Sequence, residues 1–349
     1  MDAARRLNGV RTGRLRRTRG QILAVAILLF LPLSALLLAV ARSGPAARDR
    51  IQLQTAADAA VLAAAGWSAR ACNLLAQAHE TSAQLAAGIA ILRAVKPARA
   101  RAEAILDALA AAGQASPESV AAERKILAAW EDGLADLIPL AEPGAPGGLW
   151  AAAETVESLR VSLLQSVPRL IVEDAGAIGR ENGAADLAVW PPHPVLPVEE
   201  APLSILREKA DGWRERGAKR LAAGLKGALL SNPRALYEAE TETALASALA
   251  DAAFPVHPVV WRADARESLD LVAVALGTGT AAGAGVAFAQ ARPANPERGD
   301  LMTAGWVARL VPAARAGRAL EELSLQSRRG LSPVGLRLEP GTVDALTCH

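Results

Sequence analysis

The fold is decided by residues 14–67, which read RLRRTRGQILAVAILLFLPLSALLLAVARSGPAARDRIQLQTAADAAVLAAAGW. An arginine-rich run ends at Arg19, a run without any charge covers residues 20–41, and an alanine-rich segment opens at Gln52. A helix rises about 1.5 Å per residue and a bilayer core is about 30 Å thick, so about 20 apolar residues are needed to cross it. The uncharged run meets that length and predicts a transmembrane helix at residues 20–41, preceded by a basic leader at residues 1–19.

Pro32 lies in the middle of this run. Proline kinks a helix but is tolerated inside membrane spans. The flanking charges predict the orientation, because the flank richer in Lys and Arg stays in the cytoplasm. The leader carries one acidic residue, Asp2, and seven arginines: Arg5, Arg6, Arg11, Arg14, Arg16, Arg17 and Arg19. We therefore expect the N-terminus in the cytoplasm and residues 42–349 on the far side of the membrane.

Two forms of proteolytic processing stay open as alternatives to a permanent anchor. Ala39-Val40-Ala41 fits the small-residue site at which a secretory signal is cleaved, although secretory apolar regions usually have about 7–15 residues and this one is longer. A cut between Gly20 and Gln21, as in pilin-like precursors, would leave the apolar helix on the mature chain. Pilins usually have Glu at the fifth position after that cut, where this chain has Val25.

The charge and the cysteines bound the classes of partner. The formal net charge is +2, and because the leader holds the positive excess, the rest of the chain is slightly acidic. Nucleic acid is therefore not an expected partner, since it requires a basic face. Cys72 and Cys348 can pair in an oxidising periplasm or remain unpaired, and both alternatives stay open. Their spacing lacks the histidines of a zinc site, so we predict no metal and no cofactor.

Beyond the span, the sequence predicts a mainly helical region. Alanine is abundant and aromatic residues make up only 3% of the chain, which favours helices over a β-sandwich. We expect Ser43-Gly44-Pro45 to break the span from a long helix at 46–95, either continuous or jointed near Gly66. Pro97 should interrupt that helix, and Ser116 should cap the start of a later one. The later helices are expected at residues 98–112, 117–138, 149–167, 203–230 and 233–252.

A change of character toward the C-terminus predicts a small antiparallel sheet. Short segments rich in Val, Leu, Trp and Phe are separated by Gly, Pro and Asn. The glycine-rich run at 276–285 is expected to be a hairpin loop, because it lacks the Gly-Lys-Ser/Thr of a phosphate-binding loop. A last helix is expected at 314–328. The expected strands cover residues 256–261, 268–276, 285–291, 305–311 and 334–338.

The predicted fold class is mainly α, with a single N-terminal transmembrane helix, an extracytoplasmic helical region resembling a bundle, and a small antiparallel β-sheet near the C-terminus. Residues 176–202 are polar and then proline-rich, and we expect an extended connector there. The expected regions are the leader at 1–19, the span at 20–41, a helical periplasmic region at 46–175, the connector at 176–202, a helical pair at 203–252 and an α+β region at 253–349.

The segment just past the span resembles a known family. Residues 53–65 read LQTAADAAVLAAA, and with the basic leader and single span they resemble the TadE/TadG-like proteins of Tad (Flp) pilus assembly. Residues 289–293 and 306–312 look like a further segment of some members. The resemblance implies an anchored periplasmic component of an envelope assembly at the bacterial inner membrane, with the lipid bilayer and other envelope or pilus-assembly proteins as partners, and it supplies no catalytic residues. The family motif in this chain consists of Gln54, Ala56, Ala57, Asp58, Ala59 and Ala60.

The motifs of common enzymes do not occur in the chain. His79-Glu80 lacks the second histidine of a zinc protease, and no Gly-x-Ser-x-Gly or Ser-x-x-Lys is present. His193, His257 and His349 are expected to be solvated rather than ligands. We therefore predict a non-enzymatic protein that acts through protein contacts, with homo- or hetero-oligomers formed through helices. The main alternative is a membrane-anchored binding or sensing module with a pocket in the C-terminal sheet, followed by an enzyme with an unrecognised site.

Overall fold

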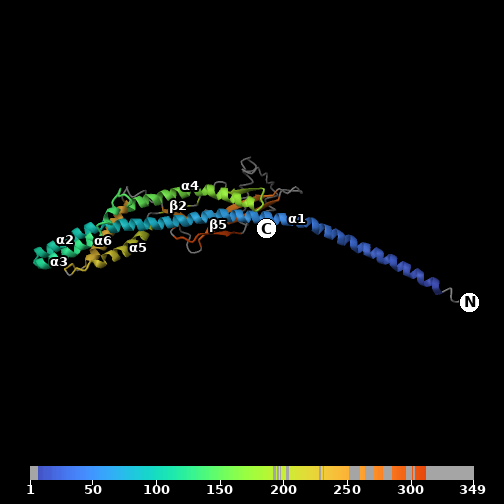
Figure 1. Ribbon diagram of the computed structural model, residues 1–349, viewed down its shortest axis with the longest axis horizontal. Helices are drawn as coiled ribbons and strands as arrows, with labels where there is room; N and C mark the ends of the chain where they lie inside the picture. The colour runs from blue at the N-terminus through green and yellow to red at the C-terminus, as the bar shows by residue number, and fades with distance from the viewer. Residues whose placement is uncertain are drawn as a thin grey trace.

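One very long helix forms the axis of the molecule (Figure 1). The computed structural model describes residues 7–191, 204–227, 232–250, 270–277, 285–295 and 303–311, together with 194, 196, 198–201, 229–230, 260–263 and 301. Helix α1 (Leu7–Arg93) is continuous for 87 residues, or about 130 Å at 1.5 Å per residue. Its N-terminal part extends alone, and the other described elements lie along or beyond its C-terminal part.

The predicted break at Ser43-Gly44-Pro45 is wrong, because α1 passes through Pro32, Pro45 and Gly66 without interruption. A proline removes one backbone hydrogen bond, whereas every flanking residue extends a helix that is already nucleated. The Ser43 hydroxyl also donates to the carbonyl of Val40 at 3.2 Å, which adds a hydrogen bond beside Pro45. The apolar N-terminal segment and the body of the protein therefore share one helix.

Pro97 does interrupt the axis, as expected. Helix α1 ends at Arg93 and α2 (Val95–Ala111) starts two residues later. Pro97 has no N–H with which to bond the carbonyl one turn earlier, at Arg93, so the bonding pattern breaks there. The buried Tyr237 hydroxyl donates to the carbonyl of Ile91 at 2.7 Å, just before this break. A residue far along the chain thus stabilises the end of α1.

The next helix begins where the sequence predicted. Ser116 caps α3 (Pro117–Asp132), and its hydroxyl accepts from the backbone N–H of Ser119 at 3.2 Å. The predicted extension of this helix to residue 138 is wrong, because α3 ends at Asp132 and turns lead into a short 3-10 helix, η1 (Ile138–Ala141).

Helix α4 (Leu149–Glu181) runs antiparallel to α1 along its side (Figure 1). Its predicted end at residue 167 is wrong, since the helix continues through Pro168 for more than three further turns. Val167, Ile171 and Ala175 explain the continuation: they are spaced by four residues, lie on one face and are all buried in the same cluster as α1.

The secondary structure of residues 176–202 differs from the predicted extended connector. Residues 176–181 belong to α4, and two strands follow, β1 (Asp186–Trp190) and β2 (Val198–Ala201). Strand β1 was not predicted, because the prolines that follow it favour an irregular segment. Its partner strand also lies far away in the sequence: Asp186 pairs with Leu276 and Trp190 with Val272. Such long-range pairing leaves little local signal.

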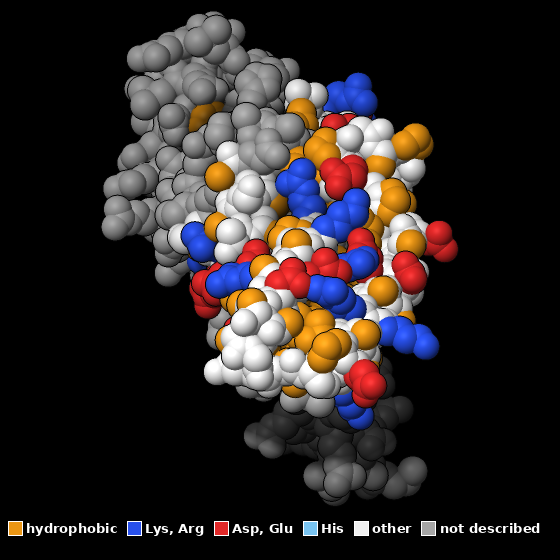
Figure 2. Space-filling model, turned by 90° about the vertical axis from the view of Figure 1, so that its left-hand side faces the viewer, with side chains coloured by type: hydrophobic (Ala, Val, Ile, Leu, Met, Phe, Trp, Pro, Cys, Tyr) orange, Lys and Arg blue, Asp and Glu red, His pale blue; other side chains and the backbone are white. Residues whose placement is uncertain are grey.

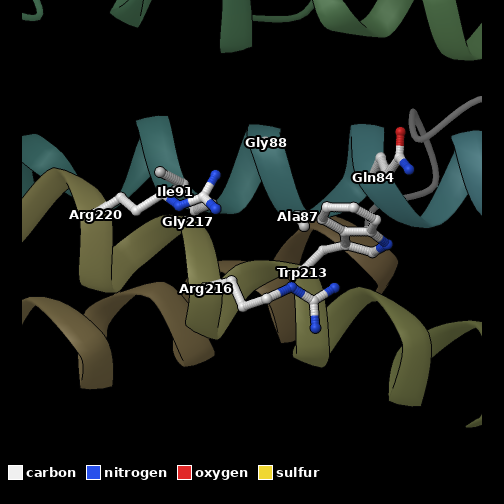
Figure 3. Close-up of a pocket in the computed structure, with 8 residues that line it drawn as sticks. All are labelled: Gln84, Ala87, Gly88, Ile91, Trp213, Arg216, Gly217 and Arg220. Atoms are coloured by element: carbon white, nitrogen blue, oxygen red, sulfur yellow. The ribbon is translucent and has the colours of Figure 1, made fainter.

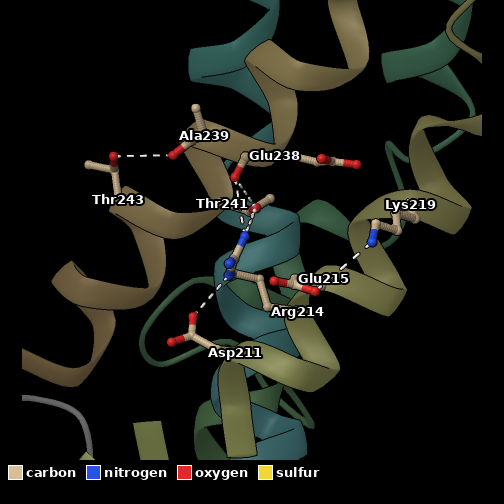
Figure 4. Close-up of polar contacts among 8 residues, drawn as sticks. All are labelled: Asp211, Arg214, Glu215, Lys219, Glu238, Ala239, Thr241 and Thr243. Atoms are coloured by element: carbon tan, nitrogen blue, oxygen red, sulfur yellow. Dashed lines mark hydrogen bonds and ion pairs between the residues drawn. The ribbon is translucent and has the colours of Figure 1, made fainter. Parts of the chain in front are cut away.

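Two further helices pack against α1 at the end away from its free segment (Figure 1). They are α5 (Ser204–Leu221), which is followed by the short η2 (Ala222–Gly224), and α6 (Pro233–Ala250). The prediction for the first was too long, at 203–230. Buried Arg214 joins the two helices: its guanidinium donates to Asp211 at 3.1 Å, to the Thr241 hydroxyl at 3.1 Å and to the Glu238 carbonyl at 3.2 Å (Figure 4).

The predicted small antiparallel sheet near the C-terminus is confirmed. Its four strands lie in the order β1-β4-β5-β6, all antiparallel, with β4 (Leu271–Leu276), β5 (Val286–Ala294) and β6 (Val307–Leu310). A separate pair joins β2 to β3 (Val260–Ala263). The glycine-rich run links antiparallel β4 and β5, and the Gly277 N–H donates to the Gly285 carbonyl at 2.9 Å. The two ends of the run therefore lie side by side, while residues 278–284 between them lie outside the described part of the chain.

The core is divided along the axis. One buried cluster joins α1 between Leu53 and Leu75 to α4 and to one face of the sheet. Two more clusters lie toward the far end of α1, where α2, α3, α5 and α6 meet. Many contact positions are alanine, so the elements approach closely and each contact buries little area.

Several predicted features lie outside the described residues. They are the helix at 314–328, the strand at 334–338, most of the strand at 256–261, Cys348, His193, His257 and His349.

Candidate functional site: the exposed apolar helix and the alanine-rich motif

The free part of α1 exposes a continuous apolar surface. Every described side chain from Ile27 to Ala41 is exposed, and Leu28 and Phe30 are each 72% exposed. The most apolar window has a mean hydropathy of 2.0, and none of it is buried by the described parts of the protein. Soluble proteins rarely expose a contiguous apolar surface of this size. This helix is long and apolar enough to cross a membrane, which fits a membrane-anchored protein.

The alanine-rich motif begins shortly after this segment. In contrast to that segment, the apolar face of the motif is fully buried. Ala56, Ala57 and Ala60 are all 0% exposed, and Ala59 is half-buried. The buried positions follow the spacing of one helical face, i, i+3, i+4, i+7, and they are Leu53, Ala56, Ala57, Ala60, Val61, Ala64 and Ala65. Small side chains on this face allow the sheet and α4 to approach the α1 backbone.

The two polar residues of the motif fasten the sheet to α1. The Gln54 amide nitrogen donates to the Asp58 carboxylate at 2.9 Å and to the carbonyl of Phe288 in β5 at 3.1 Å. The carbonyl of Gln290, two residues along the strand and therefore on the same edge, accepts from Val311 N–H at 3.0 Å. Strand β6 ends at Leu310, and the carbonyl of Phe288 lies beyond that end on the same edge of β5. The Gln54 side chain supplies a hydrogen-bond donor to this carbonyl. Asp58 orients the Gln54 amide for this contact.

A second polar contact on α1 holds the segment before β6. The side-chain oxygen of Asn73 accepts from the backbone N–H groups of Gly305 and Trp306 at 2.8 and 2.9 Å, and its nitrogen donates to the Trp306 carbonyl at 2.9 Å. Gly305 has φ +135°, a conformation that favours glycine. Sequence reasoning missed this role of Asn73, because its partners are more than 230 positions away.

His79 belongs to the same contact rather than to a metal site. Its ring is fully buried, and Nδ1 lies 3.0 Å from the carbonyl of Leu301. Among the described residues, no group of three or more His, Cys, Asp or Glu side chains is placed to hold a metal ion. The burial of His79 was not foreseen from the sequence.

Cys72, next to Asn73 on α1, belongs to the buried cluster that joins α1 to α4 and the sheet. It is 2% exposed, and burial raises the pKa of its thiol to about 12. A thiol that stays protonated at neutral pH is a poor nucleophile. Cys72 forms no disulfide within the described part of the chain, and pairing with Cys348 stays a prediction.

Buried charge also occurs in the middle of α4. Arg160 is 1% exposed, and its guanidinium donates to Glu157 at 2.7 Å. Burial lowers the pKa of Arg160, and burial raises the pKa of Glu157, although the nearby guanidinium acts in the opposite direction on the carboxyl. The Arg160 Nε and one terminal nitrogen have no hydrogen-bond partner among the residues that the structure describes. The pair is a structural feature of α4, with no reacting group beside it in the described residues.

Comparison with known proteins identifies the N-terminal segment only. Residues 20–69 match the model of a family described as putative Flp pilus-assembly TadE/G-like. The match covers the apolar segment of α1 and the whole alanine-rich motif. No curated protein and no solved structure shows a significant match to the chain.

Proposed function

We propose that the chain is a non-enzymatic, membrane-anchored component of a Tad/Flp-type pilus or secretion assembly, with its N-terminus in the cytoplasm and its body in the periplasm. The observation that carries this proposal is the position of the family match at residues 20–69, where one uninterrupted helix joins an exposed apolar segment to the buried motif. The basic leader supports the orientation.

The geometry suggests how such a component would act. The motif fastens the sheet and α4, which runs antiparallel to α1, onto α1 directly after the apolar segment. The body therefore extends from the membrane as a rod that cannot rotate independently of its anchor. A rod of this kind is suited to presenting surfaces to partner proteins at a fixed distance from the bilayer.

The far end of the rod has the surface of a protein that meets water or a polar partner. Figure 2 shows acidic and basic side chains intermingled with small apolar patches over this end. Some of these charges are already paired: Arg101 donates to Glu240 at 2.7 Å, and Arg124 pairs with Asp107. Exposed pairs of this type contribute little stability, so they are free to re-pair with a partner protein.

Deletion and complementation in the native bacterium test the assembly role. We expect the deletion to abolish surface Flp pili, the intact chain to restore them, and a chain whose residues 1–41 are replaced by a cleaved secretory signal to fail although it is exported. Normal piliation of the deletion strain would contradict the proposal, and so would full restoration by the released form.

Cysteine labelling tests the orientation independently. In a chain without its two native cysteines, a membrane-impermeant maleimide should label Glu118→Cys, an exposed position on α3, once the outer membrane is permeable. Asn8→Cys in the leader is the control, and it should react only after the inner membrane is opened. Labelling of Asn8→Cys first would reverse the proposed topology.

A further inference from the structure

A cavity of about 190 Å³ lies between α1 and α5, away from the sheet and from the alanine-rich motif (Figure 3). The helices touch at Gly217, where an added Cβ would lie 2.5 Å from the Ile91 side chain. One turn earlier on α5, the larger Trp213 stands against α1 and its indole N–H donates to Glu80. The cavity is lined by Gln84, Ala87, Gly88, Ile91, Trp213, Arg216, Gly217 and Arg220.

The cavity combines an apolar wall with two cations. Arg216 lies over the Trp213 ring at 4.4 Å from its centroid, and the Arg220 side chain extends along the other end toward Ile91 (Figure 3). Neither guanidinium has an ion-pair partner within the described part of the chain. On the same helix, Arg214 pairs with Asp211 at 3.1 Å and Lys219 with Glu215 at 4.0 Å. The two arginines at the cavity are thus available to an anion.

The lining restricts what that anion can be. Apart from the Gln84 amide and the two arginines the lining is apolar, so few amide groups of a peptide would find hydrogen-bond partners there. An ammonium compound would meet two like charges. A carboxylate suits both guanidiniums, because arginine binds carboxylates through paired, charge-assisted hydrogen bonds. The body of the ligand must be compact and apolar, since an engineered apolar cavity of about 150 Å³ accommodates benzene.

We propose that this cavity binds a free monocarboxylate with a compact apolar body, of the size of benzoate. Arg220, beside Ile91, bonds the carboxylate, and Arg216, stacked on Trp213, adds its positive charge, while Trp213 and Ile91 contact the apolar body. The Arg216–Trp213 stack positions one guanidinium before the ligand arrives, which reduces the side-chain entropy lost on binding. This site is independent of the assembly role, because it uses neither the anchor nor the motif.

Ligand-observed NMR and calorimetry on the full chain in detergent test the proposal with three probes of similar size: benzoate, benzyl alcohol and benzylamine. Benzoate should bind at least about tenfold more tightly than benzyl alcohol, a difference of about 1.4 kcal/mol, because charge-assisted hydrogen bonds from arginine to a carboxylate are stronger than hydrogen bonds to a neutral hydroxyl. Benzylamine should not bind. Equal affinity for the three probes, or no binding of benzoate, would overturn the proposal.

Two variants locate the site. The double change Arg216→Gln and Arg220→Gln should lower the affinity for benzoate about tenfold or more, and Ala87→Phe should abolish binding by filling the cavity. The matched control is Lys209→Gln with Lys219→Gln, which removes the same charge from α5 outside the cavity. Unfolding midpoints establish that each variant is folded. A control that weakens binding as much as the arginine pair would show general electrostatic attraction and would overturn the assignment.

Discussion

Ala60 tests whether the alanine-rich motif acts by allowing close contact. Its side chain is 0% exposed and belongs to the face of α1 that packs against the sheet and α4. Ala60→Leu adds three carbon atoms where packing is already tight, so neighbouring side chains or the sheet must move. Overpacking of this kind costs about 1–3 kcal/mol. At about 2–4 °C per kcal/mol, as in domains of about 150–250 residues, the unfolding midpoint should fall by about 2–12 °C.

Thermal unfolding of the full chain in detergent micelles, followed by tryptophan fluorescence, measures this decrease. Trp306 is buried in the cluster that joins α1, α4 and the sheet, and Trp67 packs against it and donates to Asp174 on α4, so both report the loss of this packing. Ala59→Leu is the matched control: this neighbour is half-buried, so the added atoms can reach solvent and the midpoint should change by less than about 2 °C. If Ala60→Leu is as stable as Ala59→Leu, the motif does not act through close packing.

Three further predictions concern the Gln54–Asp58 contact, the Tyr237 hydroxyl and the Cys72 thiol. Gln54→Ala and Asp58→Ala should each reduce the free energy of unfolding by about 1 kcal/mol in urea titrations. The double variant should lose less than the sum of the two, because both residues serve one contact to β5. Strictly additive losses would contradict this role. Tyr237→Phe leaves the buried Ile91 carbonyl without its 2.7 Å donor and should cost about 1–3 kcal/mol, so an unchanged urea midpoint would count against that role. Burial raises the pKa of the Cys72 thiol, so the folded chain keeps the thiol proton to higher pH than the unfolded chain. The free energy of unfolding therefore has its full value below about pH 8.5 and falls as the pH rises further. Between pH 8 and pH 10 under reducing conditions, the wild type should therefore lose about 1–2 kcal/mol relative to Cys72→Ala, whereas a constant difference would show that the thiol is not held protonated.

Local patterns were sufficient for the parts of the fold that local physics determines. The uncharged run at 20–41 and the alanine-rich segment after it predicted the helix, although not which face of it is buried. Ser116 predicted the start of α3, because a cap acts within one turn. Composition and turn residues were enough to expect β4, β5 and β6.

The errors arose where cooperative or distant effects outweigh a local signal. The sequence predicted a break at Pro45 and a helix end just before Pro168. Both helices continue instead, because helical turns on both sides of Pro45 and the packing of α4 around Pro168 outweigh the loss of one hydrogen bond. Strand β1 forms because β4 offers it a ladder across about 85 positions of sequence.

The candidate site shows the same division. The motif residues Gln54 and Asp58 could be found as a pattern, but their role required knowing that β5 lies beside them. Asn73 and His79 carried no signal at all, since a side chain that bonds a distant backbone carbonyl looks like any polar residue on a helix. Arg216 and Arg220 likewise became a candidate site only when α5 was placed against α1.

The central claim is that α1 is a permanent anchor continuous with the body, and the mature protein in its native membrane tests this most directly. We would measure its intact mass and N-terminal residue and its resistance to carbonate extraction. The account predicts an uncut chain that still carries its basic leader and stays in the membrane pellet. A chain beginning at Gln21 would show pilin-like processing, and a soluble chain beginning at Arg42 would show release by a signal peptidase; either result would contradict the claim of an uncut anchor.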